Sequence, residues 1–387
     1  MSVFLRFVAL YAFMYAAFGV SSPFMPAFFK ERGLTPKQLG FLFAAGTAIR
    51  LVSAPLVGRL ADLTGALRTA LAGSELVAAA VALALISAPA FTPLLLTSLL
   101  NAAALAPTTA LADALALDAA RSRDDRPRFE YGWVRGIGSA VFVVGTLLSG
   151  QVVGSRGLTS IVVLQAALLG GAAAAAVLLP KPRREPVAER AAGAGALLRV
   201  PQFRRVMLVS ALVLGSHAMH DTFAVIRWGA AGITPAMASV FWSEAVAAEV
   251  IVFFLVGPAL LARLHPATVV AVAAAAGVVR WAAMAWSASA MVLVLVQPLH
   301  GLTFAALHLA CMRLIPAIVP PGLAATAQAF YAFGAGATTA LLTLASGWIY
   351  ATFSAQGFLA MALLCAAVPL LTAPLATIGT PPGRAQR

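Results

Sequence analysis

Charged residues are scarce in this chain of 387 residues: Asp, Glu, Lys and Arg make up only 10% of it, whereas a soluble domain carries about 25%. Hydrophobic residues account for 61%, and the mean hydropathy is +0.94. These values exclude an ordinary soluble domain. Apolar stretches of roughly 20 residues recur along the chain, each long enough to cross the hydrocarbon core of a bilayer as a helix. The sequence therefore predicts a polytopic membrane protein.

Cysteine and lysine are also rare. The two cysteines, Cys311 and Cys365, both fall in predicted helices, so neither a disulfide framework nor a thiol-rich metal motif is expected. The chain has three lysines and no G-x-x-x-x-G-K phosphate loop, which argues against direct use of ATP. It also lacks a nucleophile elbow and a cofactor fingerprint. We expect no enzyme activity, no catalytic residue, no cofactor and no resident metal.

The apolar stretches predict an all-α membrane protein of twelve transmembrane helices. Their expected ranges are 4–27, 37–58, 69–89, 92–117, 131–153, 158–180, 205–228, 236–262, 267–288, 290–315, 323–350 and 355–379.

Positive charge is distributed unevenly between the loops. A net charge of +13 would suggest a nucleic-acid partner in a soluble protein, but in a membrane protein the positive-inside rule is the better test. With the N-terminus placed in the cytoplasm, most Lys and Arg fall on that side, including the runs at 121–128 and 181–205. We therefore predict both termini in the cytoplasm, a bacterial-type inner membrane and no nucleic-acid partner. The first segment lacks a cleavage site and is expected to stay as a helix.

A short repeat divides the chain. "GLTP" at 33–36 recurs as "GITP" at 232–235, an offset of 199 residues, and the same offset pairs Arg50 with Glu249. In both copies Gly can end one helix, Thr can cap the next and Pro can occupy its first turn. Six helices separate the copies, so they share one orientation and form a parallel repeat. We predict a six-helix bundle at 1–180, a basic cytoplasmic linker at 181–204 and a second six-helix bundle at 205–387, functional as a monomer.

This architecture resembles that of the major facilitator superfamily. The loop "GRLADLTGALR" at 58–68 is similar to the cytoplasmic loop signature of that superfamily: Gly58 and Asp62 match it, but Leu63 stands where a basic residue is expected. The resemblance implies a gating role for Gly58 and Asp62.

Several further segments are similar to the phenylpropionate permease family, proton-coupled facilitators related to the lactose permease and to nucleoside symporters. They include "EYGWVRGIGS" at 130–139, "AAEVIVF" at 247–253, "GVVRW" at 277–281 and "QPLHGLTFAALHLACMR" at 297–313. The matching residues are Arg50, Asp113, Tyr131, Arg135, His217, Glu249, Arg280, His300, His308, Gln328 and Tyr331. His220, Asp221, Arg227 and Glu244 depart from the pattern, so a specificity particular to this chain is expected there.

Ionisable residues inside the predicted helices are the candidates for transport chemistry, since each costs at least about 2.5–3.5 kcal/mol in hydrocarbon unless it is paired, solvated or neutral. Buried carboxylates outnumber arginines, and a carboxylate that changes protonation is what proton coupling requires. The candidates for proton coupling are Glu249, Glu244, Asp221 and His300. The lactose permease resemblance implies a Glu, an Arg and a His on helices 8, 9 and 10, but Thr303 replaces a further expected Glu.

The expected substrate contacts centre on Arg280, whose planar fork suits a carboxylate. The full set is Arg280, His217, His220, Arg50, Trp242, Trp281, Gln328 and Tyr331. Simpler interpretations stay open: Glu249 and Arg280 as a structural ion pair, and the tryptophans as packing residues. Asp113 and Arg135, near the cytoplasmic ends of their helices, are expected to form a structural or gating pair.

The stretch "LGSHAMHDTF" at 214–223 places His217, His220 and Asp221 on roughly one side of a helix. A polar patch lining a cavity, hydrogen bonds between helices and a metal site are the three interpretations, in that order. The sequence as a whole predicts proton-coupled symport of a small, aromatic organic acid by alternating access. The alternatives are sugar or nucleoside symport, drug efflux, and a membrane scaffold that transports nothing.

Overall fold

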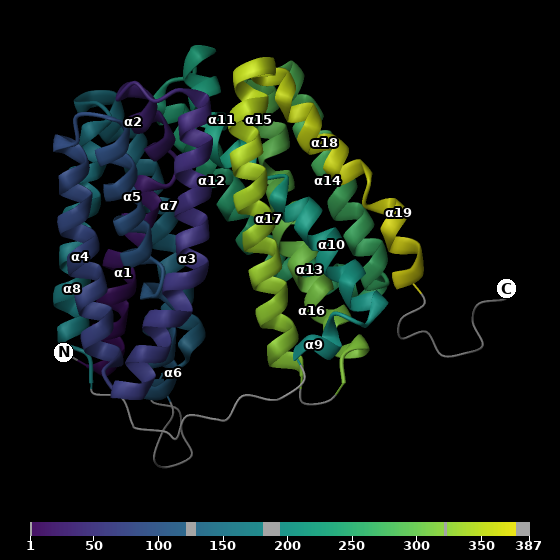
Figure 1. Ribbon diagram of the computed structural model, residues 1–387, viewed down its shortest axis with the longest axis horizontal. Coiled ribbons are helices and arrows are strands. Elements are labelled where there is room, and N and C mark those ends of the chain that lie inside the picture. The colour runs from purple at the N-terminus through teal and green to yellow at the C-terminus, as the bar shows by residue number, and fades with distance from the viewer. Residues whose placement is uncertain (1, 121–128, 181–193, 321–322, 377–387) are drawn as a thin grey trace, which may run out of the picture. The chain divides into compact units, whose positions relative to one another are not determined.

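The computed structural model describes residues 2–120, 129–180, 194–320 and 323–376, and within those ranges every regular element is a helix. The first half of the chain contains α1 (Val3–Ser21), α2 (Met25–Glu31), α3 (Pro36–Thr64), α4 (Leu67–Ser87), α5 (Phe91–Leu105), α6 (Thr108–Ala120), α7 (Tyr131–Arg156) and α8 (Thr159–Val177). Figure 1 shows most of them side by side, with the N-terminus at one end of the group.

The second half is more interrupted, because short π- and 3-10-helical segments are inserted between its α-helices. Its elements are α9 (Ala194–Leu197), α10 (Pro201–Gly215), α11 (Ala218–Ala230), α12 (Pro235–Ile251), the π-helix η1 (Val252–Val256), α13 (Gly257–Arg263), α14 (Pro266–Trp286), α15 (Ala290–Val296), the 3-10 helix η2 (Gln297–Leu299), the π-helix η3 (Gly301–Ala306), α16 (Leu307–Ile318), α17 (Ala324–Phe353), the 3-10 helix η4 (Ser354–Gly357), α18 (Phe358–Ala366), α19 (Pro369–Thr372) and the 3-10 helix η5 (Ala373–Leu375).

Eleven helical runs among the described residues are long and apolar enough to span a membrane. The last of them, Thr326–Leu375, has 50 residues, about twice what one crossing needs. The chain turns within it at Ser354, whose φ is 49°, and α18 runs back from the end of α17 (Figure 1). This run therefore contains the last two predicted helices, and the prediction of twelve spans is confirmed.

Helix boundaries differ from the predicted ones by a few residues, and six spans expected to be unbroken are interrupted: 4–27, 92–117, 205–228, 236–262, 290–315 and 355–379. The span predicted at 205–228 begins at Pro201 and is divided by a turn at Ser216 and His217. The spans predicted at 236–262 and 290–315 contain the π segments η1 and η3. Hydrophobic periodicity does not reveal the π segments, because they leave the apolar run intact, whereas the turn at Ser216 and His217 coincides with polar residues.

The repeated tetrapeptide has the same local structure in both copies. Gly33 and Gly232 both have φ of 86°, a left-handed conformation that glycine adopts without steric cost. The Thr35 hydroxyl accepts a hydrogen bond from the Gln38 amide at 3.3 Å, and Thr234 accepts one from the Met237 amide at 3.3 Å. Helices α3 and α12 then begin at the prolines of the two copies. The predicted end, cap and first turn are all present.

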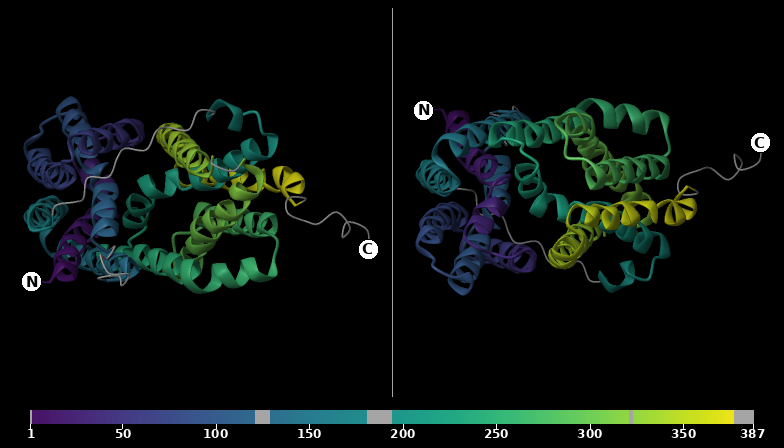
Figure 2. Two further views of the ribbon diagram at one scale, coloured as in Figure 1. Left: turned by 90° about the horizontal axis from the view of Figure 1, so that it is seen from below. Right: turned by 90° about the horizontal axis from the view of Figure 1, so that it is seen from above.

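The chain forms two compact units. Unit 1 comprises Met1–Ala188 together with Trp228–Ser243, and unit 2 comprises Glu189–Arg227 together with Glu244–Arg387. Figure 2 shows the helices of each unit from both ends. The predicted linker at 181–204 lies partly in 181–193, outside the described residues.

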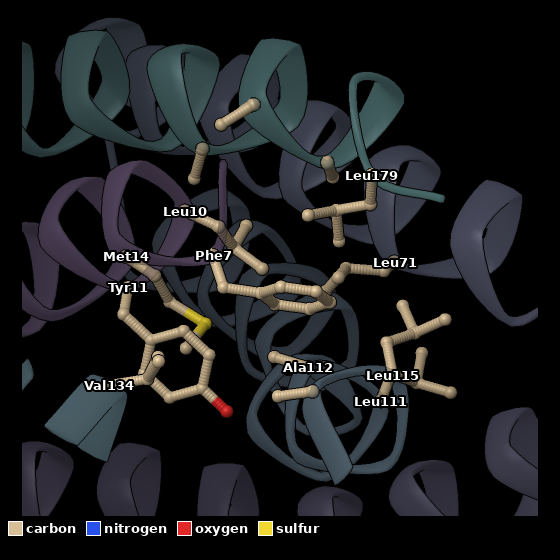
Figure 3. Close-up of a cluster of buried hydrophobic side chains, with 14 of the residues drawn as sticks. Phe7, Leu10, Tyr11, Met14, Leu71, Leu111, Ala112, Leu115, Val134 and Leu179 are labelled. Carbon is tan, nitrogen blue, oxygen red and sulfur yellow. The ribbon is translucent and has the colours of Figure 1, made fainter. Parts of the chain in front are cut away.

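The core of unit 1 forms around α1, which packs on α7 and α8. Figure 3 shows one apolar cluster, which contains Phe7, Leu10 and Met14 of α1, Leu71 of α4 and Leu111 of α6. All five side chains are at least 97% buried, so the helices are held together by close apolar packing, which is what drives helix association in lipid.

Candidate functional site

Arg280 of α14 is the centre of a polar cluster in unit 2, and its side chain has 0% exposed surface. Its Nη1 donates to Nδ1 of His300 at 3.0 Å, and its Nη2 donates to Oε1 of Gln297 at 2.8 Å. Nη2 also lies 3.4 Å from Nε2 of His220. The guanidinium carbon is 4.5 Å from the centroid of the Trp281 ring, a cation–π contact. The buried positive charge is therefore solvated by neutral acceptors and an aromatic face.

The two histidines beside Arg280 each contact a carboxylate on their far side. Nε2 of His300 lies 3.4 Å from Oε2 of Glu249, and Nδ1 of His220 lies 3.1 Å from Oδ1 of Asp221. The Glu249 side chain is 25% exposed and that of Asp221 is 56% exposed. Asp221, His220, Arg280, His300 and Glu249 thus form a continuous row, which we call the Arg280 chain. It has a buried guanidinium at the centre and an accessible carboxylate at each end.

The chemistry of the guanidinium fixes the protonation of both imidazoles. A guanidinium only donates hydrogen bonds, so Nδ1 of His300 and Nε2 of His220 act as acceptors. The opposite ring nitrogens then carry the hydrogens: Nδ1 of His220 donates its hydrogen to Asp221, and Nε2 of His300 faces Glu249 at 3.4 Å. Both histidines are neutral in this arrangement. The charges of the Arg280 chain reside on Arg280 and on the two carboxylates.

His217 has both ring nitrogens engaged at the turn between α10 and α11. Its Nδ1 is 3.0 Å from the Val213 carbonyl oxygen, and its Nε2 is 2.9 Å from the Thr303 hydroxyl. The neighbouring Ser216 hydroxyl accepts a hydrogen bond from the Trp281 indole at 2.8 Å. His217 therefore ties the interrupted helix to η3, and the position where the lactose permease pattern expects a Glu is taken by its partner Thr303.

The two π-helical segments lie beside Glu249 and His300 of the Arg280 chain. Glu249 stands three residues before η1, and His300 directly precedes η3. The two segments pack against each other, and a Cβ at Gly301 would lie only 2.6 Å from the Ala248 carbonyl oxygen. The Glu249–His300 contact thus depends on a backbone approach that only glycine permits. Single-turn π segments within α-helices are frequent at functional sites.

A second polar cluster lies in unit 1. The Tyr11 hydroxyl donates to Oδ1 of Asp113 at 2.5 Å, and Nη1 of Arg135 lies 3.5 Å from the same oxygen. Arg135 also donates to the Tyr15 hydroxyl, and the rings of Tyr11 and Tyr15 stack with centroids 5.7 Å apart. Asp113 and Arg135, which the sequence placed together, are therefore in contact, and two tyrosines from α1 complete their environment.

The remaining sequence-predicted residues are outside these two clusters. Tyr331 is buried, and its hydroxyl is 3.5 Å from Nδ1 of His308, whereas Gln328 is exposed. One carboxylate oxygen of Glu244 is buried and has no hydrogen-bond partner among the described residues. In unit 1, Arg50 and Asp62 are exposed, Gly58 is half-buried in α3, and Trp242 is buried.

Two of the interpretations left open by the sequence do not match the geometry. Glu249 and Arg280 do not form a direct ion pair, because His300 lies between them. Within the part of the chain that the structure describes, no three His, Cys, Asp or Glu side chains are arranged to share a metal ion. In "LGSHAMHDTF", His220 instead faces the buried guanidinium, and Asp221 contacts the other side of its ring.

Sequence reasoning missed Gln297, Ser216, Thr303, Tyr11 and Tyr15 as members of the two clusters. Tyr11 and Tyr15 could have been identified from the sequence, because two tyrosines at i and i+4 occupy one face of an apolar helix. Gln297 is an isolated amide in an apolar run, which is a weaker signal. The hydroxyl residues cannot be singled out, since Ser and Thr are common in membrane helices.

Comparison with known proteins agrees with this architecture. The chain belongs to the MFS_1 like family, whose model matches residues 4–360, and it is therefore a multi-pass transporter of the major facilitator superfamily and not an enzyme. It is 30% identical over 363 residues to the probable 3-phenylpropionic acid transporter of Escherichia coli (strain K12), covering 93% of this chain and 94% of that protein.

Solved structures show the same fold at lower sequence identity. The crystal structure of the nucleoside transporter NupG superposes with a TM-score of 0.85 at 17% identity, covering 97% of this chain and 100% of that one. A bacterial homologue of the human lysosomal transporter Spinster, in an inward-facing and unoccupied conformation, superposes with a TM-score of 0.72 at 14% identity, covering 97% and 96%. The expectation of a major facilitator fold is confirmed.

Proposed function

We propose that this transporter carries out proton-coupled symport of a small organic acid with an aromatic ring, working by alternating access. The observation that supports this proposal is the environment of Arg280. Its guanidinium is fully buried, yet no described carboxylate lies within 4.0 Å of it. A buried charge without a direct counter-ion favours binding of an anion. A carboxylate substrate supplies one, and the planar fork of arginine matches its two oxygens.

Aromatic side chains around Arg280 support a substrate that carries a ring. Phe304 is half-buried and stacks on His300 with centroids 5.6 Å apart, whereas Trp281 is fully buried under the guanidinium. A half-buried ring can interact with a further ring by stacking or edge contacts. The printed name of the E. coli relative, a probable 3-phenylpropionic acid transporter, points to the same class of substrate.

Charge balance supports the coupling of transport to a proton. Moving an anion across the hydrocarbon region without a compensating charge is costly, and a proton placed on Glu249 or Asp221 removes one negative charge from the site when the substrate anion adds one. The hydrogen-bond pattern favours these carboxylates over His300 as proton carriers, because Arg280 occupies the lone pair that His300 would need.

The cellular arrangement follows from the charge distribution. We propose a bacterial-type inner membrane with both termini in the cytoplasm, because the basic runs at 121–128 and 181–205 then lie on the inner side. We also propose 181–204 as the linker between the two six-helix bundles, and a monomer as the functional unit.

The deciding experiment is uptake by purified protein in proteoliposomes. An imposed gradient, acidic outside, should drive accumulation of radiolabelled 3-phenylpropionate, and a protonophore should abolish it. Empty liposomes and a panel containing a sugar and a nucleoside serve as controls. Accumulation that is independent of the gradient would remove proton symport, and preference for the sugar or nucleoside would remove the organic acid.

A further inference from the structure

The Arg280 chain has the same order of groups on both sides of Arg280. Two carboxylates, and not one, therefore occupy positions suited to proton coupling. On each side of Arg280 there is one neutral imidazole and then one carboxylate. The two histidine–carboxylate contacts, at 3.4 Å and 3.1 Å, are of similar length. No feature of these contacts restricts proton chemistry to Glu249.

We propose that Asp221 is a second proton-carrying carboxylate of this site and that it alternates with Glu249 as the counter-ion of Arg280. The proposal rests on the proposed function, since it names which groups carry the proton during symport. His220 is a positioning residue in this scheme, because it links Asp221 to the guanidinium without changing its own charge.

Counting charges gives the proton inventory. With both carboxylates ionised, the Arg280 chain has one positive and two negative charges, so the neutral resting state holds one proton on either Glu249 or Asp221. A substrate anion that binds at Arg280 replaces the ionised carboxylate as counter-ion, and that carboxylate takes a proton from water. When the anion leaves on the opposite side, the proton returns to water there. One proton crosses with each monovalent anion.

The exposure of the groups fits this exchange. The Asp221 side chain is 56% exposed, as the proposed exchange of a proton with water requires, whereas His220 is 3% exposed and Arg280 is fully buried. Asp221 also stands in the first turn of α11, where the helix dipole stabilises its ionised form. Its accessibility and its link to Arg280 are the two properties that a proton site requires.

Other titratable groups from the elements of unit 2 surround this row. His217 of the α10–α11 turn has its ring centroid 5.1 Å from that of His300, and its two nitrogens are engaged elsewhere. Cys365 of α18 donates to the Ser216 hydroxyl at 3.4 Å, and His308 of α16 contacts Phe253 and Tyr331. Asp221 and Glu249 are the two carboxylates that contact the histidines of Arg280.

The test is a two-by-two set of carboxamide variants in proteoliposomes: Asp221→Asn, Glu249→Gln and the double variant. Gradient-driven uptake and proton-independent counterflow are measured for each, with Glu31→Gln, an exposed carboxylate on α2, as matched control. Each single variant should keep gradient-driven uptake within about tenfold of the wild type, and the double variant should lose at least about a hundredfold, because the two groups replace each other. Counterflow in the double variant shows that the protein is folded and binds substrate.

Two results would overturn the role of Asp221. One is loss of all gradient-driven uptake in Glu249→Gln alone, and the other is a double variant no worse than Glu249→Gln. In both cases wild-type uptake still follows the gradient, so the proposed function stands. If the wild type ignores the gradient, the proposed function and this inference fail together.

Discussion

Arg280 shows at the residue scale how a membrane protein keeps a full charge with no exposed surface. Removing an ion from water costs several kcal/mol even after relaxation of the protein. Three acceptors, on His300, Gln297 and His220, and the face of Trp281 offset that cost. None of these partners is charged, which supports the proposed binding of an anion.

Replacing Arg280 by Lys tests whether the fork itself binds the substrate. Lysine keeps the charge but cannot bridge His300 and Gln297 while facing a carboxylate. We therefore expect the substrate KM to rise about 10–100-fold, which corresponds to the loss of one charge-assisted hydrogen bond. Uptake kinetics in proteoliposomes measure this, and exposed Arg59→Lys is the matched control. An unchanged KM for a carboxylate substrate would contradict direct contact.

The sequence predicted part of this cluster and missed another part for a physical reason. Intramembrane charge marked Arg280, Glu249 and Asp221, because each is costly in lipid and needs a partner. The order of the contacts, with a histidine on each side of the arginine, depends on how α11, α14 and η3 are rotated against one another. Spacing along one helix does not contain that information.

At the scale of elements, the π segments η1 and η3 set the distance between Glu249 and His300. Just before η1, the last turns of α12 meet η3 where Gly301 approaches the Ala248 carbonyl oxygen, so the backbones of α12 and η3 are in contact without an intervening side chain. Close backbone approach through small residues is a common way to join membrane helices. Here the backbone contact lies next to Glu249 and His300 in the sequence.

Replacing Gly301 by Ala should force these two segments apart. The added methyl group would meet a backbone oxygen that cannot move aside, so we expect a loss of about 1–3 kcal/mol of stability and a strong decrease of gradient-driven uptake. Gly170→Ala in α8 is the control, because nothing lies within 4 Å of a Cβ built there. Thermal unfolding in detergent and uptake assays give the two readouts. Equal melting temperatures of the two variants would show that the contact tolerates a side chain.

The sequence predicted helix ends correctly where short motifs determine them. The two Gly-x-Thr-Pro turns were correctly predicted from four residues each, since glycine, threonine and proline have distinct backbone roles. The π segments were not predicted, because they leave no gap in the apolar run, and the turn at Ser216 and His217 was not predicted although polar residues mark its position.

On the scale of the whole molecule, the family match and the fold agree with twelve helices in two parallel sets. The charge bias predicts their direction in the membrane. A green fluorescent protein fused after Arg387 should fluoresce, and alkaline phosphatase fused there should be inactive, because the C-terminus is expected in the cytoplasm. Fusions after Gly157, between α7 and α8, serve as the control and should give the opposite pair of signals. Active phosphatase at the C-terminus would reverse the topology.

The fixed positive charge of Arg280 also has a consequence for the choice of coupling ion. A sodium ion needs several oxygen ligands and keeps its charge when bound, whereas the polar groups that contact the buried guanidinium are two imidazoles and the single amide oxygen of Gln297. A proton differs, because on reaching a carboxylate it becomes part of an O–H bond and leaves no ion to repel. We therefore expect the proposed symport to use a proton, selected by charge and bonding, and not a sodium ion held in a cage of matched size.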